Sequence, residues 1–221
     1  MRASQVGSQL GTIRGPSAIA DIWFAWVGAH AADVEAFSRA YLSDDENARL
    51  PSYRVREAAE RYVVTRSLVR IVLSEHLGVA PRDIRVRRTD TGKPIVTDGV
   101  HFNVTHSGDL ILLAISETRP VGVDVERRRQ VDRVLALTQR WLTESEQSDL
   151  GALNAAGMTE SDAFLKIWSL KEARLKALGV GIAGAARATL DTVDVYPLDD
   201  LLQTISHEGS EPGYVGALAF A

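Results

Sequence analysis

Cysteine is absent from this chain of 221 residues and lysine is scarce, since the chain has 21 arginines but only four lysines. Without cysteine the chain has no disulfide, no thiolate metal site and no cysteine nucleophile. The net charge of −4 at pH 7 argues against a general nucleic-acid binder. Three of the four lysines, Lys166, Lys171 and Lys176, fall within one short stretch, so the few lysines are concentrated rather than scattered.

Long apolar runs are also missing. No segment approaches the roughly 20 apolar residues that span a bilayer, and polar residues interrupt the N-terminal stretch where a signal peptide would need an apolar core. We therefore expect a cytoplasmic protein without membrane attachment, with a flexible polar leader over residues 1–18. The chain is 45% apolar and 24% charged, which is typical of a folded globular protein.

Helical spacing of apolar residues predicts two long helices, over 53–77 and 161–178, each followed by a glycine. Alternating apolar residues and turn signals predict strands between and after them. The expected strands cover 84–87, 100–104, 110–115, 121–126, 190–195 and 213–220, with a helical region at 132–151 and a loop at 151–157. This order favours an α+β fold of two similar halves, 19–117 and 118–221, each with a long helix packed on a small antiparallel sheet.

Two carboxylates share one face of an expected strand. In the segment Gly122–Glu126, Asp124 and Glu126 point the same way because side chains alternate along a strand. Oxygen-only donors suit Mg²⁺ or Mn²⁺ better than Zn²⁺. Alone, the same pattern also fits an edge strand with a solvated acidic face.

The second long helix aligns a tryptophan, a glutamate and a lysine. Trp168, Glu172 and Lys176 stand four residues apart, so they form one stripe of the helix. Burial of the tryptophan would draw Glu172 inward, where a third carboxylate could complete a metal site. The alternative is an ordinary amphipathic helix with a Glu–Lys pair.

A basic block occupies residues 49–93, with ten arginines and Lys93 against five acidic residues. A local positive field in an acidic chain suits a polyanionic ligand of limited size, because guanidinium groups match phosphate oxygens. Lys93 lies on a Thr-Gly-Lys-Pro turn, where backbone N–H groups can also hold phosphate. His106, between Thr105 and Ser107 at the end of an expected strand, is a further ligand candidate.

Four segments, in order, resemble the Sfp-type 4′-phosphopantetheinyl transferases. They are Thr91–Pro94, Phe102–Gly108, Gly122–Glu126 and Trp168–Lys176, and the resemblance spans about residues 40–180. It implies a monomer with two α+β halves related by a pseudo-twofold axis and coenzyme A bound between them. It also implies Mg²⁺-dependent transfer of 4′-phosphopantetheine to a serine of an acyl or peptidyl carrier protein, with release of 3′,5′-ADP.

The resemblance also implies residue roles. Asp124, Glu126 and Glu172 would hold the metal, and Glu172 or a metal-bound water would accept the serine proton. Lys176 would neutralise the α-phosphate, and Glu146 matches a further acidic residue of the family. The expected coenzyme-binding residues are Arg54, Arg61, Lys93, Thr105, His106, Asp124, Lys171 and Lys176, with Arg61 and His106 nearest the 3′-phosphate.

Two departures and two alternatives remain. Thr105 stands where the family usually has serine, and Arg49, Arg54 and Arg56 are the only basic candidates where relatives often use lysine. A Mg²⁺ enzyme that hydrolyses a nucleotide pyrophosphate could use the same carboxylates, and an arginine-rich binding module could use the basic block without catalysis. The motifs leave open whether the carrier serves fatty-acid, polyketide or nonribosomal peptide synthesis.

Overall fold

The computed structural model describes residues 3–15, 18–97, 99–181, 190, 192–205 and 213–221. Its α-helices are α1 Val34–Tyr41, α2 Asp44–Asn47, α3 Arg56–Leu77, α4 Val134–Trp141, α5 Glu144–Ala155, α6 Glu160–Leu178 and α7 Asp199–Gln203. Its strands are β1 Ser8–Arg14, β2 Ile19–Trp26, β3 Arg87–Arg88, β4 Pro94–Ile95, β5 His101–Ser107, β6 Leu110–Ser116, β7 Val121–Arg127, β8 Asp194–Pro197 and β9 Tyr214–Phe220. Short 3₁₀ turns lie at Ala3–Gln5, Gly28–His30, Leu50–Ser52 and Pro81–Asp83.

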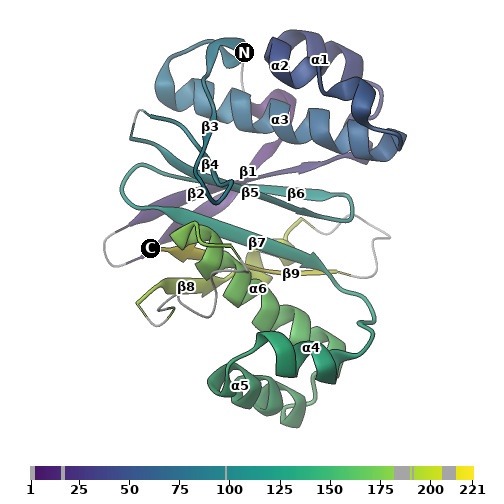
Figure 1. Cartoon of the computed structure of the whole chain (residues 1–221), viewed down its shortest axis with the longest axis vertical. Coiled ribbons are helices and arrows are strands. Elements are labelled where there is room, and N and C mark those ends of the chain that lie inside the picture. Colours follow the sequence, from purple (N-terminus) through teal and green to yellow (C-terminus); the bar gives the residue numbers. More distant parts are fainter. Residues whose placement is uncertain (1–2, 16–17, 98, 182–189, 191, 206–212) are drawn as a thin grey trace.

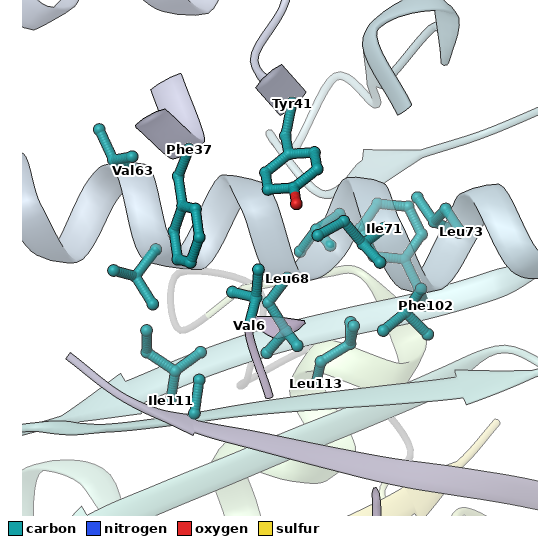
Figure 2. Packing of buried hydrophobic residues seen from close by; sticks show 14 of the residues in the cluster. Val6, Phe37, Tyr41, Val63, Leu68, Ile71, Leu73, Phe102, Ile111 and Leu113 are labelled. Carbon is teal, nitrogen blue, oxygen red and sulfur yellow. The ribbon is translucent and has the colours of Figure 1, made fainter. Parts of the chain in front are cut away.

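In the first half, α3 lies across a four-stranded antiparallel sheet of order β1-β2-β6-β5 (Figure 1). Its 22 residues include no glycine or proline, and Gly78 ends it in the left-handed conformation with φ 66°. Leu68 packs in a buried cluster with Leu113 of the sheet and with Phe37 and Tyr41 of α1 (Figure 2). Burial of each such side chain contributes roughly 1.5–3 kcal/mol, so α3 is held mainly by its apolar face.

In the second half, α6 packs on a three-stranded antiparallel sheet of order β7-β9-β8 (Figure 1). Gly122 of β7 allows an unusually close approach, because a Cβ there would lie 2.1 Å from Ala173 O of α6. Gly179 ends α6 with φ 71°, as Gly78 ends α3. Helices α4 and α5 form a small lobe against the first turns of α6, where Trp168 stacks on Phe164.

The two sheets pack against each other and share one apolar core. Ile22 and Leu112 of the first sheet meet Val123 and Leu218 of the second in that core. The molecule is therefore layered as α3, four-stranded sheet, three-stranded sheet and α6 (Figure 1). This arrangement confirms the predicted α+β fold, with two halves that each carry a long helix on a small antiparallel sheet. The boundary at residue 118 stays a prediction.

The expected flexible leader is wrong over residues 3–15. Val6 is fully buried in the core beneath α3, and β1 pairs with β2 from Ser8 opposite Phe24 to Arg14 opposite Ile19. The segment resembles a leader because β1 is the edge strand of its sheet. Backbone hydrogen bonds hold an edge strand, and its side chains can be polar.

Other expected boundaries also shift. The region 132–151 contains two helices, because a capping box of Thr143 and Glu146 starts α5 as a new helix. Gly151 lies inside α5, so the expected loop is wrong up to residue 155. Of the expected strand at 84–87, only Arg87 lies in a strand, β3. Of the expected strand at 190–195, residue 191 lies outside the described residues and β8 begins at Asp194. None of the described helices combines the length and apolar character needed to cross a bilayer.

Candidate active site

Charged residues of β7 and α6 meet next to β5, at the contact between the two halves. Lys176 Nζ donates to Asp124 Oδ1 at 2.5 Å and to Thr105 Oγ1 at 3.2 Å. The Thr105 hydroxyl donates to the same oxygen of Asp124 at 3.2 Å. One side chain from each of β5, β7 and α6 therefore joins a single hydrogen-bonded cluster.

Strands β5 and β7 are aligned by side chains rather than by a backbone ladder. Asn103 Oδ1 accepts a hydrogen bond from Val123 N at 2.9 Å, and Ser107 Oγ accepts one from Arg127 N at 3.0 Å. Residue numbers increase together along the two strands, from 103 opposite 123 to 107 opposite 127, so β5 and β7 run in the same direction. This register places Thr105 beside Asp124.

The carboxylates near this cluster, buried at Asp124 and half-buried at Glu126 and Glu172, repel one another. Burial raises the pKa of Asp124 to about 6; Lys176 opposes this rise, and Glu126 and Glu172 add to it. Burial also raises the pKa of Glu172; the charge of Lys176 opposes this rise, and the charge of Glu126 adds to it. Asp124 Oδ2 and Glu172 Oε1 are buried oxygens without a hydrogen-bond partner. A bound cation would relieve both the repulsion and the missing bonds.

The donor set fits a hard divalent cation, although the carboxylates do not close around one. Within the described residues, no group of three or more His, Asp or Glu side chains is arranged to hold a metal ion. Glu126 Oε2 instead accepts from Ser107 Oγ at 3.2 Å and pairs with Arg129 Nη1 at 2.8 Å. The unpartnered oxygens of Asp124 and Glu172 keep their capacity as ligands, and an all-oxygen set suits Mg²⁺ or Mn²⁺.

A basic groove lies between α3 and β5 and is open to solvent. Its lining includes Arg61 and His106, which were selected from the sequence, together with two tyrosines whose rings lie 5.2 Å apart. The lining residues are Arg49, Tyr53, Ala58, Arg61, Tyr62, Thr65, Arg66, Arg88, Pro94, Val104 and His106. Four guanidinium groups and an aromatic pair suit a ligand that has both phosphates and a planar ring.

His106 connects this groove to the carboxylate cluster. Partial loss of hydration lowers the pKa of His106, and the charges of Arg61 and Lys176 lower it further. The imidazole thus lies within the electrostatic reach of a groove arginine on one side and of the α6 lysine on the other.

Other predicted binding residues lie outside the groove lining. Arg54 is exposed, and Arg56 pairs with Glu60 at 2.6 Å. Lys171 is 4% exposed and pairs with Glu146 at 2.7 Å, which ties α6 to the start of α5.

The ammonium of Lys93 also lies outside that lining. It donates to Val121 O at 3.1 Å and to Ala177 O at 2.9 Å. The Thr-Gly-Lys-Pro motif predicts a phosphate-binding turn for this lysine; in the folded chain its ammonium binds carbonyls of the other half.

The sequence motifs do not include Arg66, Arg88 or the tyrosine pair among the site residues. Arg66 and Arg88 were counted in the basic block without a role, and both line the groove. Arg66 lies 5.6 Å from the ring of Tyr62, its neighbour one helical turn earlier. The four-residue spacing of Tyr62 and Arg66 on a predicted helix is the signal that could have identified them.

Both parts of the chain match models of known protein families. Residues 120–215 match the family model described as the 4′-phosphopantetheinyl transferase superfamily, and residues 30–118 match the model for the N-terminal part of 4′-phosphopantetheinyl transferases. Together the two matches cover both halves of the molecule.

Individual relatives show the same similarity. A phosphopantetheinyl transferase of Thraustochytrium sp. is 32% identical over 194 residues, which cover 81% of this chain and 67% of the relative. The transferase HetI of Nostoc sp. is 35% identical and the transferase Sfp of Bacillus subtilis 30% identical, each over 65% of this chain. The matched region spans about three fifths of the latter two relatives, 62% of each.

Proposed function

The chain belongs to the 4′-phosphopantetheinyl transferase superfamily, and we propose that it transfers 4′-phosphopantetheine from coenzyme A to a serine of an apo carrier protein. The observation that carries this proposal is a cluster with two buried, unpartnered carboxylate oxygens, which His106 links electrostatically to an arginine-lined groove. The enzyme would act as a monomer, with acyl or peptidyl carriers as acceptors and no nucleic-acid partner.

The groove would hold the nucleotide half of coenzyme A. Arg49, Arg61 and Arg88 would neutralise phosphate oxygens, with Arg61 near the 3′-phosphate. The adjacent rings of Tyr53 and Tyr62 would contact the adenine face. The neutral form of His106, favoured by its lowered pKa, would contribute one N–H donor to a phosphate oxygen.

Asp124, Glu126 and Glu172 would hold Mg²⁺ or Mn²⁺ beside the pyrophosphate. When bound, the cation would neutralise the negative charge of the phosphates during transfer. Asp124 is paired with Lys176, and Glu126 with Arg129. To bind the cation, each carboxylate would divide its oxygens between the cation and its basic partner.

The reaction needs one proton transfer and one displacement. The serine oxygen attacks the phosphorus that carries pantetheine, and the bond from that phosphorus to the bridging oxygen breaks. The bridging oxygen leaves with 3′,5′-ADP, and the carrier gains a phosphodiester. Glu172, directly or through a water beside it, would receive the serine proton. Lys176 would offset the charge that develops on the α-phosphate.

A direct test incubates the purified chain with coenzyme A, Mg²⁺ and a panel of apo carriers from fatty-acid, polyketide and peptide synthases. Mass spectrometry should show that an acceptor gains one phosphopantetheine while 3′,5′-ADP appears. Nucleotide cleavage without acceptor modification would indicate a pyrophosphate hydrolase instead. If neither product appears, only the non-catalytic binding module is left as an explanation.

Metal dependence has a separate readout. Mg²⁺ at about ten times its dissociation constant should raise the free energy of unfolding by about 1.4 kcal/mol. The Asp124→Asn variant should show no such rise in a thermal melt. An equal rise in both proteins would place the cation elsewhere.

A further inference from the structure

The turn between β3 and β4 belongs to the first half of the chain, but it contacts the last turn of α6 in the second. Thr91 Oγ1 donates to Gly179 O at 2.5 Å, and Lys93 Nζ donates to Ala177 O at 2.9 Å. The same ammonium donates to Val121 O at the start of β7, at 3.1 Å. Two side chains therefore join the turn, β7 and the end of α6 at one point.

The turn itself is held in place by several hydrogen bonds. Thr89 N donates to Lys93 O at 2.9 Å, and Thr89 Oγ1 accepts from Lys93 N at 3.1 Å. Gly92 N donates to Thr89 O at 2.8 Å, and the hydroxyls of Thr89 and Thr91 lie 2.8 Å apart. A turn closed in this way can serve as a fixed support for another element.

These contacts satisfy carbonyls that a helix end leaves without partners. The carbonyls of Leu175 and Lys176 already accept backbone N–H groups, whereas those of Ala177 and Gly179 accept the side chains of Lys93 and Thr91. A cation is also favourable at a helix C-terminus. Burial lowers the pKa of Lys93 to about 8. The two hydrogen bonds to carbonyls and the helix C-terminus offset the cost of removing the ammonium from water.

The supported turn of α6 is the one that carries Lys176. Gly122 brings β7 against it, since a Cβ at Gly122 would lie 2.3 Å from Ala177 N. A displacement of this turn would move the Lys176 ammonium away from Asp124 and Thr105, which it contacts at 2.5 and 3.2 Å.

We propose that Thr91 and Lys93 are positioning residues, which fix the last turn of α6 on β7 and thereby set the position of Lys176, and that they do not contact the phosphates of coenzyme A. This inference rests on the transfer function proposed above. It gives Lys93 a different role from the phosphate ligand that the turn motif suggested.

The kinetic test uses Thr91→Val, which replaces a hydroxyl by a methyl group, and Lys93→Met, which removes the ammonium from a chain of similar length. Each variant should lower kcat about tenfold and leave KM for coenzyme A within about twofold of wild type, because position rather than binding is lost. Thr91→Ser should restore kcat. The control is Lys166→Met, which removes an α6 lysine paired with Asp199 and should keep wild-type kinetics.

A tenfold rise in KM with unchanged kcat would overturn the proposal, because it would identify a phosphate ligand. Unchanged kinetics in Thr91→Val and Lys93→Met would overturn it as well. Should Lys93→Met fail to fold, the pair Thr91→Val and Thr91→Ser decides alone.

Hydrogen exchange provides a readout that does not depend on transfer activity. Amides in the last turn of α6 should exchange about tenfold faster in Thr91→Val, whereas those at the end of α3 should keep wild-type rates. Unchanged exchange in α6 would overturn the support that the turn gives to the helix. Loss of the transfer function in the wild type, with faster exchange in the variant, would refute the proposed function and leave that support standing.

Discussion

Each half of the molecule pairs a cation of its long helix with a buried carboxylate, but the two clusters differ. In the first half, Arg70 of α3 is 3% exposed and donates to Glu46 Oε2 at 2.5 Å and to the carbonyls of Pro81 and Ile84 at 2.5 and 3.1 Å. In the second, Lys176 of α6 pairs with Asp124 at 2.5 Å.

The difference lies in the remaining oxygens. Among the described residues, neither Arg70 nor Glu46 has a buried polar atom without a partner, whereas Asp124 Oδ2 and Glu172 Oε1 both do. A buried acceptor without a hydrogen bond costs stability. The closed cluster of Arg70 and Glu46 is therefore structural, since it ties α2 and the Pro81–Asp83 turn to α3. The open cluster of Asp124, Glu172 and Lys176 has the character of a binding site, because a ligand would offset the cost of its unpartnered oxygens.

The largest expected effect is on the open cluster. Asp124→Asn should lower the transfer rate at least thousandfold, about 4 kcal/mol of barrier, because it removes a charge that the cation and Lys176 both need. Steady-state transfer to a carrier protein measures this. Retention of more than a tenth of wild-type activity would remove Asp124 from the mechanism.

A substitution in the closed cluster should lower stability and leave the transfer rate unchanged. Arg70→Met leaves Glu46 without its shortest partner, so the free energy of unfolding should fall by about 3 kcal/mol. Urea denaturation measures this fall, and kcat of the folded variant should equal that of wild type. A tenfold loss of kcat in folded Arg70→Met would break the distinction between the two clusters.

The close approach beneath α6 should be sensitive to a single methyl group. Gly122→Ala forces β7 and α6 apart, so the free energy of unfolding should fall by about 2–3 kcal/mol. The matched control is Gly151→Ala in α5, where an added Cβ has nothing within 4 Å and should stabilise the helix by about 0.5–1 kcal/mol. Equal effects of the two substitutions in denaturation would show that the approach is not tight.

A smaller effect is expected on the α6 face of the open cluster. Glu172→Gln and Lys176→Met should each lower kcat ten- to a hundredfold, about 1.4–2.7 kcal/mol of barrier. Single-turnover kinetics separate this loss from weaker binding. Wild-type rates in either variant would exclude that residue from the proposed roles.

Local patterns identified much of the fold because they report local physics. The helices α3 and α6 combine helical apolar spacing with a terminal glycine, and β5, β6 and β7 alternate or are bounded by turns. Strand β1 was missed because an edge strand can be polar. The break before α5 was missed because a capping box at Thr143 outweighs the continuous helical spacing.

The motifs likewise identified the residues of the open cluster. The sequence motifs select Asp124, Glu172 and Lys176, and in the fold Lys176 and Asp124 lie in contact. Neither the partner of Lys93 nor that of Lys171 could be predicted. Lys93 binds a carbonyl 84 residues away and Lys171 a carboxylate 25 residues away; spacing along the chain does not encode such distances.

The scarce lysines illustrate the division between sequence and folded structure. Composition and motif order were sufficient to single them out and to indicate the family. Their partners were determined by folding: Lys176 meets Asp124, Lys171 meets Glu146 and Lys93 caps α6. The packing of the two halves determines which oxygens come within about 3 Å of each cation. It therefore decides whether all polar atoms of a buried charged group find protein partners or some stay available to a ligand.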